Sequence, residues 1–222
     1  MKPVKFHAVL FSAVCGLLVL PLGLHSQIAS ESVLYSFCSR ANCTDGENPT
    51  VGLLQGSDGN FYGTTSDTIF KFTPAGVLTT IYSFCGPLDD CSAYDYPAYP
   101  TLIQGQDGNF YGTSINTGTY SSGEVFKLTP SGVFTSLYSF CSVNTYTYCG
   151  DGANPGAALV QDSEGNLYGT TQAGSTNADN SCYSGCGTIF KLTLSGILTT
   201  LHSFCYQVTL RTARKAQHRF PL

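Results

Sequence analysis

The chain has no Trp, a single Met and few charged residues, since Asp, Glu, Lys and Arg make up 11% of its 222 residues. This composition excludes a disordered polyelectrolyte. Basic residues are scarcest in the middle of the chain, where Gln27 to Tyr206 holds four of them against all fourteen acidic residues. Binding to phosphate backbones requires clustered Lys and Arg, so this acidic stretch argues against a nucleic-acid partner.

Motifs for common chemistries are missing as well. The sequence has no Gly-x-Ser-x-Gly elbow, no phosphate-binding loop and no dinucleotide fingerprint. His202 takes the place of Tyr82 and Tyr138 in a repeated phrase, which indicates a packing residue rather than a base. Neither Cys-x-x-Cys nor calcium-loop spacing occurs. We therefore assign no catalytic residue and expect no metal and no cofactor.

What the chain does contain is a sequence repeat with three phrases in fixed order. The first phrase, Asp/Glu-Gly-Asn-x-Tyr-Gly-Thr, begins at Asp58, Asp107 and Glu164. The second, x-Phe-Lys-x-Thr, follows each copy after a connector of variable length. The third, aromatic-Ser-Phe-Cys, closes each unit, and one more copy of it precedes the first unit at 35–38. The units differ in length because their connectors differ, while the phrases keep their length, and this is typical of a repeat architecture.

Each unit is predicted to form four short strands. The residue pair Asp-Gly or Glu-Gly favours a tight hairpin between the first two strands, because Gly tolerates positive φ. A Pro-x-Gly turn precedes the fourth strand, although Leu194 replaces this Pro in the third unit. Four strands in a period of about 50 residues indicate an all-β, β-propeller-like array of antiparallel blades. The predicted first strands are 51–55, 101–104 and 157–161.

The three phrases resemble the GloVer tandem repeat of the choice-of-anchor bacterial proteins. The resemblance extends over about residues 33–205 and is specific, because several phrases recur in one order. It implies an exported, often surface-displayed protein with propeller-like blades, and it brings no established catalytic residue. The chain departs from the family in having few repeats and no recognisable carboxy-terminal sorting segment.

The order of the strands contains a mismatch. With the strands of a unit labelled a to d, the chain reads d, abcd, abcd, abcd. Propellers commonly close by combining strands from both termini in one blade, and they have at least four blades. We therefore hypothesise a truncated or frame-shifted product of a longer array; the alternative is self-association through open strand edges. Residues 206–222 are basic and are predicted to be a disordered, non-repeat tail.

Residues 1–26 are predicted to form a signal peptide. Lys2 and Lys5 precede an apolar run, Ala8 to Leu20, that is too short for a good membrane span. Cleavage is expected after Ser26, with Ala29 as the alternative site and an uncleaved anchor as the alternative interpretation. We thus expect a secreted or cell-surface protein that has no membrane span once the signal is removed.

Export would place the cysteines in an oxidising compartment, where closely spaced pairs favour disulfides. Zinc ligation is the alternative, but the spacings differ from pair to pair. Each small ring is worth about 2 kcal/mol on the chain-entropy model. Cys205 has no partner in this scheme. The predicted pairs are Cys38 with Cys43, Cys85 with Cys91, Cys141 with Cys149, and Cys182 with Cys186.

The repeated polar residues have a structural interpretation. Asp58, Asp107 and Glu164 each precede a turn Gly, where a carboxylate can bond to nearby backbone N–H groups. They belong to separate units, so they are not expected to face one another. The repeated Lys of the second phrase is predicted to be a strand residue with an exposed or snorkelling head.

The loops carry the remaining candidates, because Tyr offers both a flat apolar face and a hydroxyl for recognition of sugar or protein. Packing over neighbouring blades is the alternative role for these tyrosines. We predict a non-enzymatic, exported scaffold that binds an extracellular protein or polysaccharide. The alternative is a fragment of a larger propeller enzyme that acts on glycans, which would need two carboxylates around one cleft. The candidate ligand-binding residues are Tyr94, Tyr96, Tyr99, Tyr120, Tyr146 and Tyr148.

Overall fold

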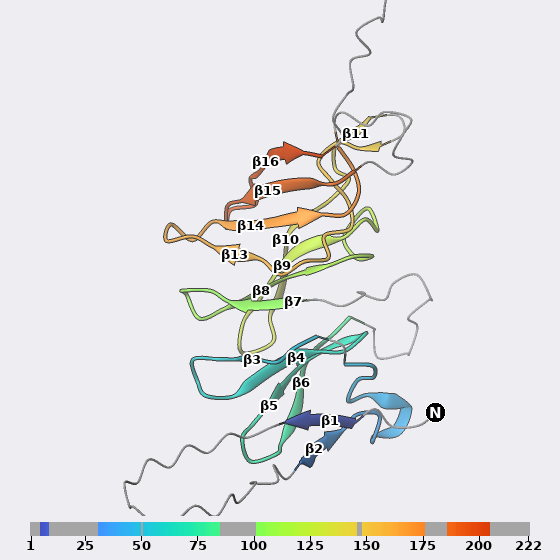
Figure 1. Ribbon diagram of the computed structural model, residues 1–222, viewed down its shortest axis with the longest axis vertical. Coiled ribbons are helices and arrows are strands. Elements are labelled where there is room, and N and C mark those ends of the chain that lie inside the picture. Colours follow the sequence, from blue (N-terminus) through green and yellow to red (C-terminus); the bar gives the residue numbers. More distant parts are fainter. Residues whose placement is uncertain are drawn as a thin grey trace, which may run out of the picture.

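The computed structural model describes residues 5–8, 31–49, 51–84, 101–145, 148–175 and 186–204. Three four-stranded antiparallel sheets follow one another along the chain, and we call them units 1, 2 and 3 (Figure 1). The predicted fold class is confirmed: the protein is all-β, with propeller-like blades of four strands. Within the described residues, no helix has the length and apolar character needed to cross a membrane.

The strands of each unit pair in chain order, as the hairpin turns require. Unit 1 contains β3 (Leu54–Gln55), β4 (Phe61–Thr64), β5 (Thr68–Phe72) and β6 (Leu78–Ser83). Unit 2 contains β7 (Thr101–Gln104), β8 (Phe110–Ser114), β9 (Glu124–Leu128) and β10 (Phe134–Ser139). Unit 3 contains β13 (Val160–Gln161), β14 (Leu167–Thr171), β15 (Thr188–Leu192) and β16 (Leu198–Ser203).

Short elements lie outside the units. β1 (Lys5–Ala8) pairs antiparallel with β2 (Ser32–Ser36). β2 is the predicted opening d strand, whereas β1 was not predicted and lies within the segment assigned to the signal. After β2 comes a single 3₁₀ turn, η1 (Ala41–Cys43), and after β10 a small hairpin of β11 (Asn144–Thr145) and β12 (Tyr148–Cys149).

The prediction for the first strand was too long in units 1 and 3, where β3 and β13 have two residues each. In these units a leucine side chain takes the place of further ladder pairing. A Cβ built on Gly63 would lie 2.8 Å from Cδ2 of Leu53, and one on Gly169 would lie 2.9 Å from Cδ2 of Leu159. The side chain therefore covers the glycine of the second strand, and the chain joins the ladder only after it.

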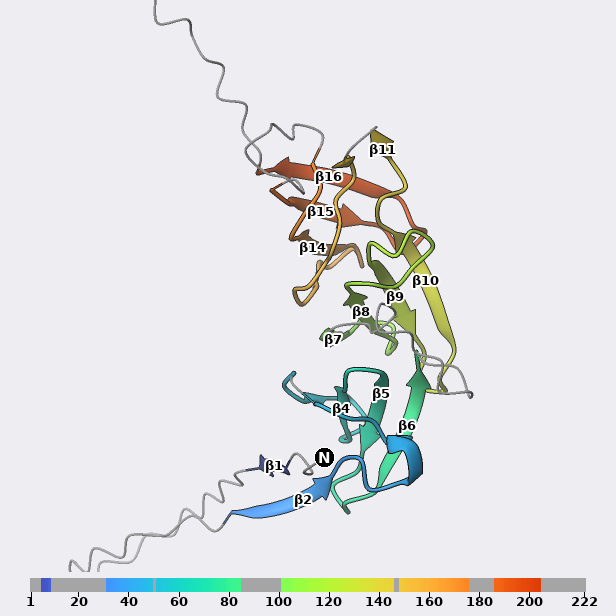
Figure 2. The ribbon, with the colours of Figure 1, turned by 90° about the vertical axis from the view of Figure 1, so that its right-hand side faces the viewer.

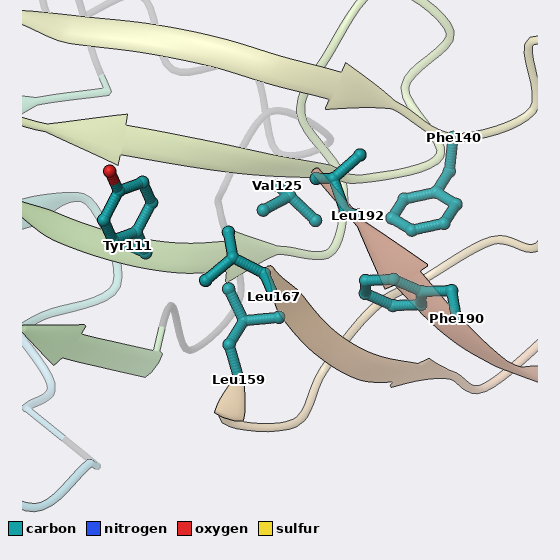
Figure 3. Close-up of a cluster of buried hydrophobic side chains, with 7 residues drawn as sticks. All are labelled: Tyr111, Val125, Phe140, Leu159, Leu167, Phe190 and Leu192. Carbon is teal, nitrogen blue, oxygen red and sulfur yellow. The ribbon is translucent and has the colours of Figure 1, made fainter. Parts of the chain in front are cut away.

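The hydrophobic core lies between consecutive units. In the largest cluster, Phe140 of unit 2 is fully buried and its ring centroid lies 5.2 Å from that of Phe190 in unit 3 (Figure 3). The closing phrase of one unit thus contributes a Phe to the next sheet. The full cluster comprises Tyr111, Val125, Phe140, Leu159, Leu167, Phe190 and Leu192.

The same junction occurs earlier in the chain. Phe84 lies 5.9 Å from Phe126 across the boundary of units 1 and 2, and Phe37 lies 5.0 Å from Phe70 between β2 and unit 1, measured between ring centroids. In the turned view, the closing strands β6 and β10 lie on one side of the stack (Figure 2). The phrases therefore recur in one order because each unit repeats the same packing contacts with the next sheet as well as the same turns.

The carboxylate of the first phrase organises its own turn. Oδ2 of Asp58 accepts hydrogen bonds from the Asn60 amide at 2.7 Å, the Tyr62 hydroxyl at 2.8 Å and Lys71 Nζ at 2.9 Å. Because Asn60 and Lys71 bond to it, the pKa of Asp58 lies well below its ordinary value. The Asp107 turn has the same bonds from its own Asn and Tyr. These contacts explain why Asp, Asn, Tyr and Lys recur together.

Glu164 does not take this role, so the prediction that it is equivalent to Asp58 and Asp107 was wrong. The acceptor in unit 3 is Asp162, which accepts hydrogen bonds from the side-chain amide of Asn166 and from the Tyr168 hydroxyl, both at 2.9 Å. The bond from Asn166 is the main reason that the pKa of Asp162 falls to about 2.

The aspartate that serves as acceptor in unit 3 also affects the space available to the tyrosine of the same turn. Asp162 occupies the position of Gly56 in unit 1, where an added Cβ would lie 2.6 Å from the Tyr62 ring. A side chain at this position requires the tyrosine to shift. Tyr168 is half-buried, whereas Tyr62, whose ring centroid lies 4.2 Å from that of Phe110 in unit 2, is 2% exposed.

The repeated lysines keep exposed heads, as predicted, but they also have specific partners. Lys71 and Lys127 lie 2.9 and 3.7 Å from the turn carboxylates Asp58 and Asp107. Lys191, whose unit lacks that carboxylate, lies 5.8 Å from the centroid of the Tyr168 ring. Pairs as exposed as these contribute at most about 1 kcal/mol each.

Candidate functional site

The candidate site lies beside β10, the closing strand of unit 2. One wall is the connector 115–123, which joins β8 to β9. Its ends are held together by a hydrogen bond from the Gly123 N–H to the Thr117 carbonyl at 3.0 Å, and Gly123 has a φ of 92°. Its middle is tied to β10, since the Thr119 N–H donates to Ser139 Oγ at 3.1 Å. Tyr120 follows and is 51% exposed.

An open pocket of about 410 Å³ lies between this connector and β10. Its lining is rich in hydroxyl groups, with one exposed aromatic ring and one leucine, and carries no charged side chain. Such a surface can pair with the hydroxyls of a neutral ligand while the ring covers an apolar face. The lining residues are Thr119, Tyr120, Ser136, Leu137, Tyr138, Ser139 and Ser142.

A buried carboxylate holds two of these lining residues in place. Oδ2 of Asp151 accepts the Tyr138 hydroxyl at 2.7 Å, the Ser142 N–H at 3.0 Å and the Ser142 hydroxyl at 2.9 Å. Asp151 is 4% exposed, and its Oδ1 has no hydrogen-bond partner among the described residues. Burial, followed by the bond to Asp151, raises the pKa of Tyr138 to about 12. The hydroxyls on the pocket floor are therefore oriented before any ligand arrives.

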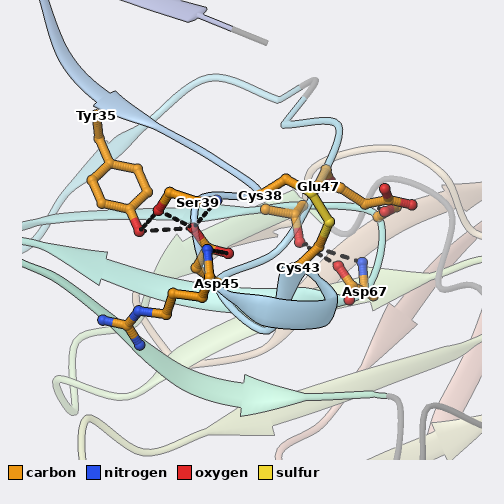
Figure 4. Close-up of a disulfide and its surroundings, with 10 residues drawn as sticks. Tyr35, Cys38, Ser39, Cys43, Asp45, Glu47 and Asp67 are labelled. Atoms are coloured by element: carbon orange, nitrogen blue, oxygen red, sulfur yellow. Dashed lines mark hydrogen bonds between the residues drawn. A yellow bond between two sulfur atoms is a disulfide. The ribbon is translucent and has the colours of Figure 1, made fainter. Parts of the chain in front are cut away.

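The same polar cluster occurs once more, in front of unit 1 (Figure 4). Oδ2 of Asp45 accepts the Tyr35 hydroxyl and the Ser39 hydroxyl, both at 2.8 Å, and the Ser39 N–H at 3.0 Å. Here Oδ1 also has a partner, the Arg40 N–H at 3.3 Å. Burial acts to raise the pKa of Asp45, but the bonds from Ser39 and Tyr35 outweigh it and the pKa lies below its ordinary value.

In both loops a disulfide lies next to the serine of the polar cluster, which is Ser39 in the first loop and Ser142 in the second. Cys38 is bonded to Cys43 and Cys141 to Cys149, so two of the four predicted pairs are present. Cys38 and Cys141 have φ values of 58° and 69°, which turn the chain sharply towards the serine that follows. Cys186 is disulfide-bonded as well. Cys85, Cys91 and Cys182 lie outside the described residues.

The repeat phrases, the stacked sheets and the disulfide-closed loops can now be compared with known proteins. The model of the Gloeobacter/Verrucomicrobia repeat matches residues 22–218. The chain belongs to this family. The resemblance to the GloVer repeat is thereby confirmed. No curated protein matches the chain.

Solved structures match the family member at low identity. A streptogramin B lyase structure is 19% identical, with a TM-score of 0.45, over 70% of this chain and 41% of that one. A putative gluconolactonase is 15% identical, with a TM-score of 0.42, over 68% of this chain and 48% of that one. The chain thus spans less than half the length of either structure.

The structure places one predicted ligand-binding residue of this repeat protein in the pocket, Tyr120. Tyr148 lies in β12, where only the backbone is described. The other four, Tyr94, Tyr96, Tyr99 and Tyr146, lie outside the described residues.

Sequence reasoning missed Tyr138 and Ser142, because it treated the closing phrase as packing alone. A usable signal was present. The pattern Asp-Gly-x-Asn-Pro follows the second cysteine at both Asp45 and Asp151, and nowhere else in the chain does it recur. Two separate loops that share a buried Asp and a preceding Tyr-Ser-Phe-Cys-Ser indicate a common polar cluster.

Two buried carboxylates, Glu124 and Asp151, lie close to the pocket. Glu124 is 4% exposed and accepts the Thr117 hydroxyl at 2.8 Å, in a position that units 1 and 3 fill with Thr68 and Thr188. Neither Glu124 nor Asp151 belongs to the pocket lining. Within the described part of the chain, no group of three His, Cys, Asp or Glu residues could hold a metal ion.

Proposed function

We propose that this repeat protein is an exported scaffold that binds a neutral carbohydrate in the pocket beside Tyr120. One observation supports the proposal above all. The exposed ring of Tyr120 lies in an uncharged pocket together with five further side-chain hydroxyl groups, which belong to three serines, one threonine and one tyrosine. Sugars present apolar C–H faces that lie against aromatic rings and hydroxyls that pair with polar side chains.

The size of the pocket favours a sugar over a protein partner. A volume of about 410 Å³ suits one or two sugar rings. Specific protein–protein interfaces bury roughly 1,200 Å² or more and are mostly flat. A neutral ligand is favoured over an acidic one because the lining has no Lys or Arg.

Export is supported by the disulfides. Bonds between cysteines five and eight residues apart close both polar clusters, and such bonds persist in oxidising compartments. The predicted signal at residues 1–26 accords with this location. We therefore place the scaffold outside the cytoplasm, secreted or at the cell surface.

The test is a glycan array probed with the exported, oxidised full chain, followed by calorimetry on the best ligand. Tyr120→Ala should weaken binding at least about tenfold, since it removes the stacking face. Tyr120→Phe should retain most of the affinity, and Val133→Ala, which alters an exposed side chain elsewhere in unit 2, should leave it unchanged. Equal binding by wild type and Tyr120→Ala, or no glycan binding at all, would refute the proposal.

A further inference from the structure

Three polar groups at the edge of the pocket form a closed triangle of hydrogen bonds. The hydroxyl oxygens of Tyr138 and Ser142, which we call the hydroxyl pair, lie 2.7 and 2.9 Å from Oδ2 of Asp151 and 2.8 Å from each other. The contact between the two hydroxyls is exposed to solvent, whereas both bonds to Asp151 are partly buried. The carboxylate is therefore the buried corner of the triangle, and the hydroxyl pair is its open side.

Both hydrogens of the hydroxyl pair are used inside the triangle. Each hydroxyl has one hydrogen, and an ionised carboxyl group only accepts hydrogen bonds, so at least one hydroxyl donates to Asp151. The other donates either to the same oxygen or to the neighbouring hydroxyl. In both arrangements no hydrogen remains for a ligand, while each hydroxyl oxygen keeps a lone pair. The hydroxyl pair therefore presents two adjacent hydrogen-bond acceptors to the pocket.

The backbone holds the triangle in this direction. The Ser142 N–H donates to the same Oδ2 of Asp151 at 3.0 Å, so three donors converge on one acceptor atom. The corresponding triangle of Tyr35, Ser39 and Asp45 has the same three bonds (Figure 4). The polarity thus comes from the repeated loop, but only Tyr138 and Ser142 of these residues line the pocket beside Tyr120.

Ser139, on the β10 side of the pocket, has the opposite arrangement. Its Oγ accepts the Thr119 N–H at 3.1 Å, and this bond leaves the hydrogen of the hydroxyl for another acceptor. The pocket therefore differs from one side to the other. A ligand has to present donors to the hydroxyl pair, whatever it presents to Ser139.

Neighbouring hydroxyl groups of a sugar ring suit the hydroxyl pair. Their oxygens are about as far apart as those of Tyr138 and Ser142, and each has a hydrogen to donate. Sulfate, phosphate, carboxylate and O-methyl groups present only lone pairs, which would face the lone pairs of the protein. A site that is built to hydrogen-bond a hydroxyl discriminates against an analogue that lacks it, because a polar group of the site is then left unpaired.

We propose that the hydroxyl pair makes the pocket selective for a sugar with two neighbouring unsubstituted hydroxyl groups, both of which donate hydrogen bonds. This selectivity rests on the proposed function, since it names the feature of the carbohydrate that the same pocket requires. Asp151 is a positioning residue here, because it acts by taking the hydrogens of Tyr138 and Ser142. Sugars that are sulfated, phosphorylated or O-methylated at either of the two positions are rejected.

The test uses the methyl glycosides of glucose, galactose, mannose and N-acetylglucosamine, with analogues in which one hydroxyl at a time is replaced by fluorine. Fluorine is small and cannot donate a hydrogen bond. Binding to the oxidised full chain is followed by ligand-observed NMR titration. For a glycoside that binds, fluorine at either of two neighbouring positions should weaken binding about fivefold.

Protein variants then assign the two positions. Tyr138→Phe keeps the ring and removes one acceptor, so the fluorine substitution that pairs with it should have no further effect in this variant. Ser142→Ala should cancel the effect of the neighbouring substitution instead. Tyr35→Phe and Ser39→Ala are the matched controls, because they make the same changes in the loop whose residues do not line the pocket, and both fluorine effects should persist in them.

The possible outcomes separate this selectivity from the proposed function. Glycosides that bind through Tyr120 but tolerate every fluorine substitution would overturn the selectivity alone. The same conclusion would follow if the fluorine effects persisted in Tyr138→Phe and Ser142→Ala, or if array glycans bound while all four glycosides failed to bind. Absence of binding both on the array and by the glycosides would refute the proposed function together with the selectivity.

Discussion

The loop after β2 and the loop after β10 carry the same polar cluster, and in the second loop two members of the cluster, Tyr138 and Ser142, also line the pocket. Tyr35, Ser39 and Asp45 bond to one another as Tyr138, Ser142 and Asp151 do, with distances that agree to about 0.1 Å. The difference lies beside the cluster. The second loop follows a complete unit, whose nine-residue connector 115–123 forms the other wall. The polar cluster therefore supplies one side of the pocket, and the connector supplies the other.

Connector length varies between units for a physical reason. In unit 1, three residues, 65–67, join β4 to β5. There the Thr65 hydroxyl donates to Asp67 and packs against Thr68, so the connector is closed on itself. The nine-residue connector instead reaches across to Ser139 on β10 and holds Tyr120 over the cluster. A longer connector in one unit therefore adds a wall to the pocket without a change in the four strands.

The strongest test of the comparison is removal of the buried acid from each loop. Asp45→Ala and Asp151→Ala each leave a tyrosine hydroxyl, a serine hydroxyl and a backbone N–H without their acceptor, so each should cost about 3 kcal/mol of unfolding free energy. Urea denaturation measures this loss. Glu164→Ala, an acid with one long hydrogen bond to Asn166, is the control and should cost less than about 0.5 kcal/mol. A large cost for only one of the two aspartates would show that the clusters are not equivalent.

A second test compares the disulfides. Their cysteines lie five and eight residues apart, and the chain-entropy relation gives about 2 kcal/mol for the shorter loop and about 2.5 kcal/mol for the longer one. Replacing Cys38 and Cys43, or Cys141 and Cys149, by serine should lower the free energy of unfolding by these amounts.

Glycan binding should separate the two disulfide variants more clearly than stability does. Only Cys141 and Cys149 border the loop that positions Ser142 in the pocket. Loss of binding in the Cys38 and Cys43 variant at a temperature where it is folded would contradict this assignment.

A smaller effect is expected from the tyrosine hydroxyls. Tyr35→Phe and Tyr138→Phe each remove one donor to an Oδ2 atom that keeps two others, so each should cost about 1 kcal/mol. Thermal denaturation measures the change. Only Tyr138→Phe should also alter sugar affinity, because Tyr138 lines the pocket and Tyr35 is not among its lining residues. A shift in affinity for Tyr35→Phe would show that the first loop takes part in binding.

Much of the fold was predictable because its determinants are local. Asp-Gly and Pro-x-Gly turns specify hairpins within a few residues, and Gly59, Gly76 and Gly108 have the positive φ values that such turns require. The lengths of β3 and β13 were not predictable, since they depend on whether Leu53 or Leu159 packs over a glycine of the neighbouring strand.

The site was only partly predictable because its members come from different phrases. Tyr120 stood out as a loop tyrosine, whereas Tyr138 belongs to a phrase that recurs for packing. The exchange of Glu164 for Asp162 as turn acceptor also escaped sequence reasoning, because it depends on the space beside Tyr168. In each case the deciding contact joins residues whose separation varies from one unit to another.

The finest difference between the loops is the ionisation of their tyrosines. Burial and then the Asp151 carboxylate raise the pKa of Tyr138 to about 12, from an ordinary value of 10.0. Because the folded pKa is the higher one, the stability that Tyr138 provides is complete below pH 10 and is lost as the pH rises through 12. Burial also raises the pKa of Tyr35.

NMR of ¹³C-labelled tyrosine, assigned with the two Tyr→Phe variants, follows each ring separately. Asp151→Asn should lower the pKa of Tyr138 and leave that of Tyr35 unchanged, since the Tyr35 hydroxyl bonds to Asp45 and not to Asp151. If Asp151→Asn does not move the Tyr138 titration, the carboxylate does not control the hydroxyl on the pocket floor.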